Sequence, residues 1–190
     1  MDKKNYISLA KKSVNIQIKE LKKIKKIFNK SFVKAIDLIL NCKGKVIFAG
    51  IGKSGLIARK ISATFSSVGI PSFFCDPAQA LHGDMGQIEK KDILIIFSYS
   101  GNTTELNNML KYANRYRIKI IGVASKTDSL LLKASDIKLI LPKVKEADIT
   151  GMVPTSSTSI TLLLGDCLAT TVMHRKNFSK EKFKVFHPGG

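Results

Sequence analysis

The sequence predicts a doubly wound three-layer α/β sandwich, in which one five-stranded parallel sheet lies between two layers of helices. Two observations in the 190 residues support this fold class. After residue 44, five short apolar runs alternate with segments whose apolar residues recur at helical spacing. Strands that alternate with helices form βαβ units, and such units build a parallel sheet. Functional residues are then expected in the loops at the carboxyl ends of the strands.

The first 44 residues are expected to form one long or two consecutive amphipathic helices, as part of the same domain. Lysines occupy one face of these helices. Apolar residues recur at helical spacing on the other face, namely Ile7, Ala10, Val14, Ile18, Leu21, Ile24, Phe28, Phe32, Ala35 and Ile39. Such a helix either packs against protein or lies on a membrane surface. We favour packing, because long lysine stems cover packed helices well.

Residues 45–190 are expected to form the sandwich itself. The strands are predicted at residues 45–49, 72–75, 92–97, 119–124 and 137–141. The helices are predicted at residues 54–68, 103–115, 129–134 and 156–175. The chain contains no internal repeat, low-complexity tract or linker, so a single domain is predicted.

The net charge of +18 is concentrated at the two ends of the chain. Residues 1–34 carry 11 lysines against Asp2 and Glu20, giving +9, and residues 171–190 add +4. The basic residues are 28 Lys and 4 Arg, and Arg is the side chain that best reads base edges, so we predict no nucleic-acid partner. No apolar stretch approaches the ~20 residues that span a bilayer, so no membrane partner is predicted. Three widely spaced cysteines fit a cytoplasmic protein.

The loop after the first predicted strand, residues 50–55 (GIGKSG), matches the pattern G-x-G-x-x-G. Asp76 follows about 20 residues later, where a dinucleotide site would place its ribose-binding acid. A nucleotide P-loop does not match, because Ile47 stands where its first glycine is required. A small phosphate site is the third alternative, since helix-start amides and the charge of Lys53 attract an anion. The last alternative is a tight turn that binds nothing.

The loop after the third predicted strand, residues 98–105 (SYSGNTTE), surrounds a glycine with hydroxyl groups at the start of a helix. Hydroxyls and helix-start amides together satisfy the acceptor oxygens of a phosphomonoester. A dinucleotide fold does not require this second loop, so the loop favours a phosphate ester as ligand. Asn102 and Glu105 can also form a capping box that starts the helix, and both roles are compatible.

Five segments together resemble the sugar isomerase (SIS) domain family, whose members bind phosphosugars, and within it the arabinose-5-phosphate isomerases. They are residues 50–60 (GIGKSGLIARK), 71–86 (PSFFCDPAQALHGDMG), 98–105, 154–159 (PTSSTS) and 187–190 (HPGG). The His-Gly-Asp and His-Pro-Gly-Gly pieces are the most specific. The resemblance implies the flavodoxin-like five-stranded sheet and a homotetramer with active sites between subunits. No cofactor or metal is expected, because Asp76 precedes Pro77 where some relatives carry a zinc-associated histidine.

The resemblance also implies an enzyme that interconverts D-ribulose 5-phosphate and D-arabinose 5-phosphate through an enediol, supplying 3-deoxy-D-manno-octulosonate and lipopolysaccharide synthesis. This chemistry needs an acid/base pair, a cation or donors near the oxyanion, and a phosphate anchor. Many relatives continue beyond His-Pro-Gly-Gly into CBS domains, which this chain lacks, and we expect a longer natural protein. Two alternatives are a phosphosugar-binding regulatory module without catalysis, and another isomerase such as 6-phospho-3-hexuloisomerase.

Carried over residue by residue, the resemblance implies catalytic roles for Lys53, Glu105, Glu146 and His187. His82 joins them, because a histidine pKa of ~6.5 suits ring opening or proton transfer. We expect a histidine to open the sugar ring and a glutamate to serve the enediol step, with the individual base left open. The expected substrate- and phosphate-binding residues are Gly52, Ser54, Ser98, Ser100, Gly101, Thr103, Thr104, Ser156, Ser157 and Thr158. The hydroxyls of residues 155–158 can alternatively cap the last long helix.

Overall fold

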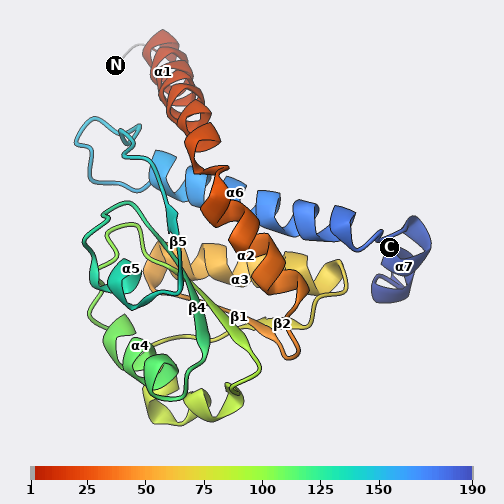
Figure 1. Ribbon diagram of the computed structural model, residues 1–190. Helices are drawn as coiled ribbons and strands as arrows, with labels where there is room; N and C mark the ends of the chain where they lie inside the picture. Colours follow the sequence, from red (N-terminus) through yellow and green to blue (C-terminus); the bar gives the residue numbers. More distant parts are fainter. Residues whose placement is uncertain (1–2, 190) are drawn as a thin grey trace.

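One sheet of five parallel strands organises the structure, a computed structural model that describes residues 3–189 (Figure 1). The strand order is β2-β1-β3-β4-β5. The strands are β1 (Val46–Gly50), β2 (Ser72–Phe74), β3 (Ile93–Phe97), β4 (Lys119–Ala124) and β5 (Ile137–Ile140). The predicted fold class is therefore confirmed, and each strand end lies within one residue of its prediction. Residues 1, 2 and 190, which the predicted domain and the His-Pro-Gly-Gly motif include, lie outside the described residues.

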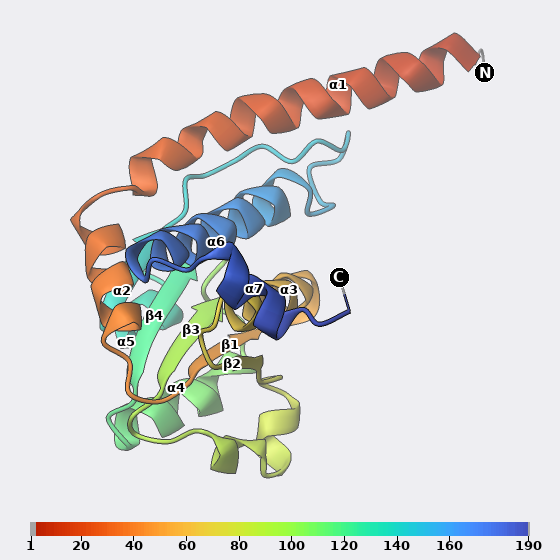
Figure 2. The same cartoon turned by 90° about the vertical axis from the view of Figure 1, so that its right-hand side faces the viewer.

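Helices cover both faces of the sheet, so the central strands are buried on both sides. Val46 and Phe48 of β1 share a core with α2 (Lys30–Leu40), α3 (Gly52–Ser67) and α6 (Ser156–Arg175). Ile47 and Ala49 point the other way, into a core with α4 (Leu106–Arg115) and α5 (Leu130–Ala134). Successive side chains of a strand point to opposite faces, which is why one apolar run contributes to both cores. Figures 1 and 2 show the helices on the two faces of the sheet.

The N-terminal region forms α1 (Lys3–Leu21), a 3-10 helix (Lys22–Ile27) and α2. The expected packing is correct for its second half, where Ile24, Ala35 and Ile39 are buried. For most of α1 this chain itself provides no cover, since the apolar residues Ile7 and Val14 are 61% and 53% exposed, and packing of α1 against protein stays a prediction there. The physical reason is that α1 leaves the body of the protein and touches α6 along only part of its length (Figure 2).

Three short helices were not predicted from the sequence. Two 3-10 helices (Gln79–His82 and Asp84–Gln87) follow β2, and α7 (Lys180–Phe186) follows α6. The predicted helix over 103–115 begins instead at Leu106, after a turn. Among the helices within residues 3–189, none is both long enough and apolar enough to cross a membrane.

Candidate active site

The candidate site lies where the strand order reverses. β1 pairs with β2 on one side and with β3 on the other, so the loops after β1 and β3 diverge at the same edge of the sheet. Ligands of doubly wound sheets bind in the crevice at this position. A cavity of about 380 Å³ opens here, between these two loops, the segment after β5 and the start of α6. It brings together six of the predicted residues, namely Lys53, Ser54, Ser100, Glu146, Ser157 and Thr158.

Glycines shape the loop after β1. Gly52 adopts φ +57° at the first position of α3, a backbone conformation that residues with a side chain rarely adopt. A Cβ on Gly55 would lie 2.6 Å from the carbonyl oxygen of Gly50, so the helix approaches the strand closely at this point. Lys53 is exposed and borders both the main cavity and a second one of about 450 Å³. Asp76 lines only the second cavity among these two.

The loop after β3 is held by its own hydroxyl groups. Ser98, which is 4% exposed, has its Oγ 2.8 Å from Thr103 Oγ1 and accepts the amide of Gly101 at 3.0 Å. Gly101 is buried with φ +69°. These contacts leave Ser100, which is exposed, as the loop hydroxyl that borders the cavity. Ser98 and Thr103 therefore shape the loop, whereas Ser100 faces the site.

The capping box predicted for Asn102 and Glu105 does not form. The Asn102 side-chain oxygen accepts the amide of Leu130 at 2.9 Å, so it ties the loop to the start of α5. Glu105 is exposed and accepts the hydroxyl of Thr104 at 3.0 Å. The reason is the turn before α4: the amide of Leu106 donates to the carbonyl of Thr103, which moves the helix start beyond the box.

Glu146 is the carboxylate that the structure places in the cavity. Its Oε2 accepts the amide of Thr155 at 2.7 Å, the hydroxyl of Thr155 at 2.9 Å and the amide of Ser157 at 3.2 Å. Burial alone would raise the pKa of this carboxyl, but the hydrogen bonds from Ser157 and Thr155 outweigh burial and lower its pKa. Glu146 is therefore ionised near neutral pH and fixed to the start of α6.

The start of α6 differs from the predicted N-capping by the hydroxyls of residues 155–158. Thr155 is the N-cap residue, but its side chain makes no cap hydrogen bond within α6. Glu146 satisfies the free amides instead, since a carboxylate suits the positive end of a helix. Ser156 Oγ is buried and has no hydrogen-bond partner among the described residues. Thr158 Oγ1 donates to the carbonyl of Thr155 at 2.8 Å.

Tyr99 is a cavity residue that sequence reasoning missed. Its ring borders the cavity beside Glu146, while its hydroxyl accepts the amide of Val144 at 2.9 Å and donates to the carbonyl of Pro142 at 3.2 Å. Burial raises the pKa of this phenol, so it stays protonated. Its position inside the hydroxyl-rich loop of residues 98–105 is the sequence feature that could have indicated a place at the site, as it did for the Ser and Thr residues of that loop.

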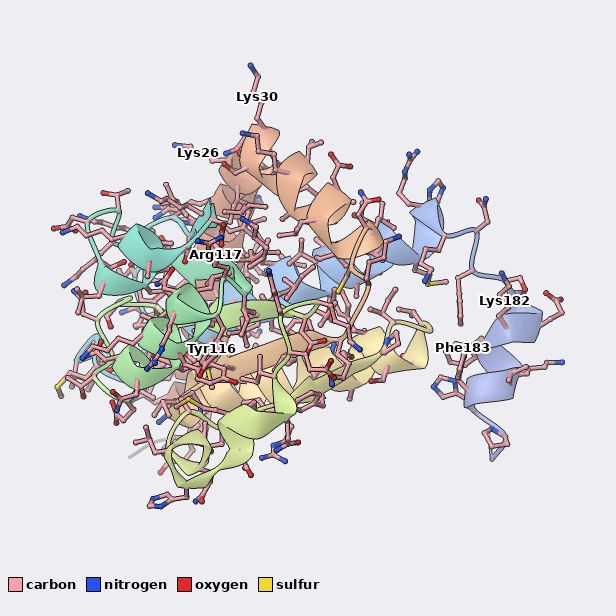
Figure 3. All side chains as sticks on the ribbon, turned by 60° about the horizontal axis from the view of Figure 1, so that its bottom comes forward. Lys26, Lys30, Tyr116, Arg117, Lys182 and Phe183 are labelled. Atoms are coloured by element: carbon pink, nitrogen blue, oxygen red, sulfur yellow. The ribbon has the colours of Figure 1, made fainter. Side chains whose placement is uncertain are left out.

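Three predicted catalytic residues lie outside this cavity. Glu105 and His82 are both exposed, the first before α4 and the second at the end of a 3-10 helix. His187 follows α7, where its ring stacks on Phe183 with centroids 3.7 Å apart. Figure 3 shows Phe183 and Lys182 on α7, to one side of the sandwich. Within residues 3–189, no group of three or more His, Cys, Asp or Glu side chains is arranged to hold a metal ion.

Curated relatives match almost the whole chain. It is 41% identical over 189 residues to the arabinose 5-phosphate isomerase KdsD of Francisella tularensis, covering 98% of this chain and 58% of that protein. It is 38% identical over 181 residues to KdsD of Escherichia coli K12, covering 95% of this chain and 55% of that protein. The chain thus spans little more than half the length of these relatives.

A solved structure and a family model agree with this relationship. The structure of E. coli CFT073 c3406 in complex with arabinose 5-phosphate superposes with a TM-score of 0.94 and 34% identity. The superposition covers 99% of this chain and 100% of that one. The SIS domain model matches residues 39–171, which include all five strands and the candidate site. The chain therefore belongs to the SIS domain family.

Proposed function

We propose that this chain is an aldose–ketose isomerase that interconverts D-ribulose 5-phosphate and D-arabinose 5-phosphate. The observation that carries the proposal is the meeting of a lysine, an ionised glutamate and short hydroxyl side chains in one cavity at the strand-order reversal. The relatives named arabinose 5-phosphate isomerase, and the similar E. coli structure in complex with that sugar phosphate, support the choice of sugar.

Glu146 is the base of the enediol step in this proposal. It takes a proton from the carbon next to the carbonyl, C2 of the aldose or C1 of the ketose, and returns it to the other carbon, while a second proton passes between the sugar oxygens O1 and O2. The electron pair of the broken C–H bond forms the enediolate, so no net oxidation occurs. Its ionised state supports this role, because a base must be deprotonated before it acts. Lys53 stabilises the negative charge on the enediolate oxygen or on the phosphate.

The phosphate group is proposed to lie between the loops after β1 and β3. Ser54 and Ser100 border the cavity from these loops, and the amides at the start of α3 point toward the same edge. Ser98 and Thr103 act indirectly in this arrangement, by keeping the loop in shape.

We further propose a cytoplasmic homotetramer in which His187 serves the site of a neighbouring subunit. Two observations support such an assembly. His187 follows α7 and does not line the cavity of its own chain, and α1 exposes apolar residues such as Ile7, Val14 and Ile18 that a partner would cover. Free thiols at Cys42, Cys75 and Cys167 agree with a reducing compartment.

A panel of five-, six- and seven-carbon sugar phosphates tests this function. We expect turnover of the two pentose phosphates, and a kcat lower by about 10²–10⁴-fold in Glu146→Gln, the range that acid–base catalysis contributes. Glu89→Gln is the control, because that exposed carboxylate pairs with Lys45 and Lys91 away from the cavity. Turnover of only a six- or seven-carbon sugar would contradict the proposal. Thermal stabilisation by phosphosugars without any turnover would instead indicate a regulatory module.

A further inference from the structure

Glu20 is a buried carboxylate to which the proposed mechanism gives no role. It lies one residue before the end of α1 and is 5% exposed. Its Oε2 pairs with Lys23 and accepts the backbone amide of Lys145 at 3.0 Å. The bond with Lys23 lowers the pKa of Glu20, and the Lys145 amide lowers it further, so the carboxylate is ionised. Lys145 directly precedes Glu146.

Within the described part of the chain, residues 142–145 pair with no strand, yet their backbone groups are bonded on both edges. On one edge, Tyr99 Oη contacts the carbonyl of Pro142 and the amide of Val144. On the other edge, the Lys23 ammonium donates to the carbonyl of Lys143 at 3.3 Å, and Glu20 accepts the amide of Lys145.

This alternation is the pattern of an extended strand, in which successive residues direct their backbone groups to opposite sides. In this segment the side chain of Tyr99 on one edge, and those of Lys23 and Glu20 on the other, bond the backbone groups that neighbouring strands would bond in a sheet. One of the two sets comes from the N-terminal helical region, 125 residues away in sequence from the amide that it binds. Through Glu20, the N-terminal region therefore bonds to the backbone directly before the cavity residue Glu146, although most of α1 projects away from the body (Figure 2).

We propose that Glu20 is a positioning residue that holds Glu146 in the geometry needed for proton transfer. The inference rests on the proposed isomerase function. Without the Glu20 carboxylate, the amide of Lys145 loses its partner and the backbone at Glu146 can shift relative to the sugar. Catalysis is sensitive to such shifts, since a misplacement of about 1 Å can lower the rate by about 10²-fold.

Steady-state kinetics on the full chain test this proposal. We expect Glu20→Ala to lower kcat by about 10- to 100-fold and to change KM by less than about threefold, because the phosphate-binding loops are untouched. Glu20→Gln should return kcat to within about fivefold of the wild-type value, because its side-chain oxygen can still accept the Lys145 amide. Should Glu20→Ala not fold, Glu20→Met carries the test, because it fills a similar space but offers the Lys145 amide no oxygen. We expect its kcat to lie at least about tenfold below that of Glu20→Gln, and equal kcat values in these two variants contradict the proposal.

Asp92→Asn is the matched control. Asp92 is also buried, at 1% exposure, and also accepts a backbone amide, that of Lys45 at 2.7 Å, while pairing with a lysine. It precedes β3, at the opposite edge of the sheet from the cavity. We expect this variant to be destabilised but to keep kcat within about twofold of the wild type. A Glu20→Ala enzyme that loses no more kcat than Asp92→Asn would overturn the proposal.

A second measurement separates this proposal from the proposed function. The amides of Thr155 and Ser157 bond to the Glu146 carboxylate, so their hydrogen-exchange rates report whether Glu146 stays in place. We expect exchange at both amides to rise by at least about tenfold in Glu20→Ala and to stay unchanged in Asp92→Asn. If the wild type does not isomerise pentose phosphates, the proposed function fails, while these rates still decide the positioning role. Unchanged rates in Glu20→Ala would refute it.

Discussion

Gly101→Ala is the substitution for which the structure makes the sharpest energetic prediction. Gly101 lies in the loop after β3 at φ +69°, in the left-handed region. A Cβ added there would meet the side-chain oxygen of Ser129, and would lie 2.5 Å from Ser129 Cβ and 3.0 Å from Ala124 Cβ. Both neighbours are fixed, because Ser129 is buried at the start of α5 and Ala124 ends β4, an interior strand of the sheet.

Two costs combine in this variant. A residue with a Cβ loses about 1–2 kcal/mol in the left-handed conformation relative to glycine. Overpacking a buried site by one carbon costs about 1–3 kcal/mol more. We therefore expect the free energy of unfolding to fall by about 2–5 kcal/mol. For a chain of this size, that corresponds to a melting temperature lower by about 4–20 °C.

Gly151→Ala separates the two costs. Gly151 has φ +70°, almost the same as Gly101, but a Cβ there would meet nothing within 4 Å. Gly151→Ala should therefore lower the free energy of unfolding by the conformational cost alone, about 1–2 kcal/mol. Urea denaturation of both variants at one protein concentration measures the difference as a change in midpoint at constant m-value. The reasoning is refuted if Gly101→Ala is no less stable than Gly151→Ala.

Three further predictions concern other parts of the molecule. The pKa of Glu146 is lowered from 4.5 in the folded protein, so its contribution to the free energy of unfolding is present above pH 4.5 and is lost as the pH falls through the lowered value. In urea denaturation at acid pH, Glu146→Gln should therefore lose less stability than the wild type; an equal loss contradicts this. Cys75 is 3% exposed, and burial raises its pKa to about 11. Maleimide should therefore label Cys42 well before Cys75, as followed by mass spectrometry of the native protein. Equal labelling rates would be inconsistent with a buried Cys75 thiol. Gly165→Ala in α6 would place a Cβ against Ile61 Cδ1, so we expect a loss of about 1–3 kcal/mol. Ile61→Val removes this Cδ1 and should partly reverse the loss; an additive double variant would argue against direct contact.

The fold could be predicted from the sequence because its strands are continuous apolar runs. β3 is an example: all five of its residues are buried, and such runs bounded by turn residues are typical of central parallel strands. The fate of α1 could not be predicted in the same way. Amphipathic spacing shows that a helix has an apolar face, but it does not show whether that face meets its own chain or another molecule.

Residues of the candidate site could be predicted where a short motif contains them, but not where their position depends on contacts between separate segments. Lys53, Ser54 and Ser100 follow directly from the two loops, and the cavity contains all three. The bonds to Glu146 come from Thr155 and Ser157, across an irregular loop, and the neighbouring amide of Lys145 is held by Glu20, 125 residues away. Neither the fixed position of Glu146 nor its lowered pKa could therefore be read from the sequence. Tyr99 was missed for a similar reason, since its partners follow another strand.

Isomerisation of D-ribulose 5-phosphate in D₂O tests the central claim most directly. If Glu146 carries the proton between C1 and C2, the proton exchanges with solvent during turnover. We therefore predict that part of the arabinose 5-phosphate formed in D₂O carries deuterium at C2 by NMR, and that Glu146→Gln slows its formation by about 10²–10⁴-fold. Failure of the wild-type protein to form arabinose 5-phosphate, or a Glu146→Gln variant that forms it at the wild-type rate, would contradict the account.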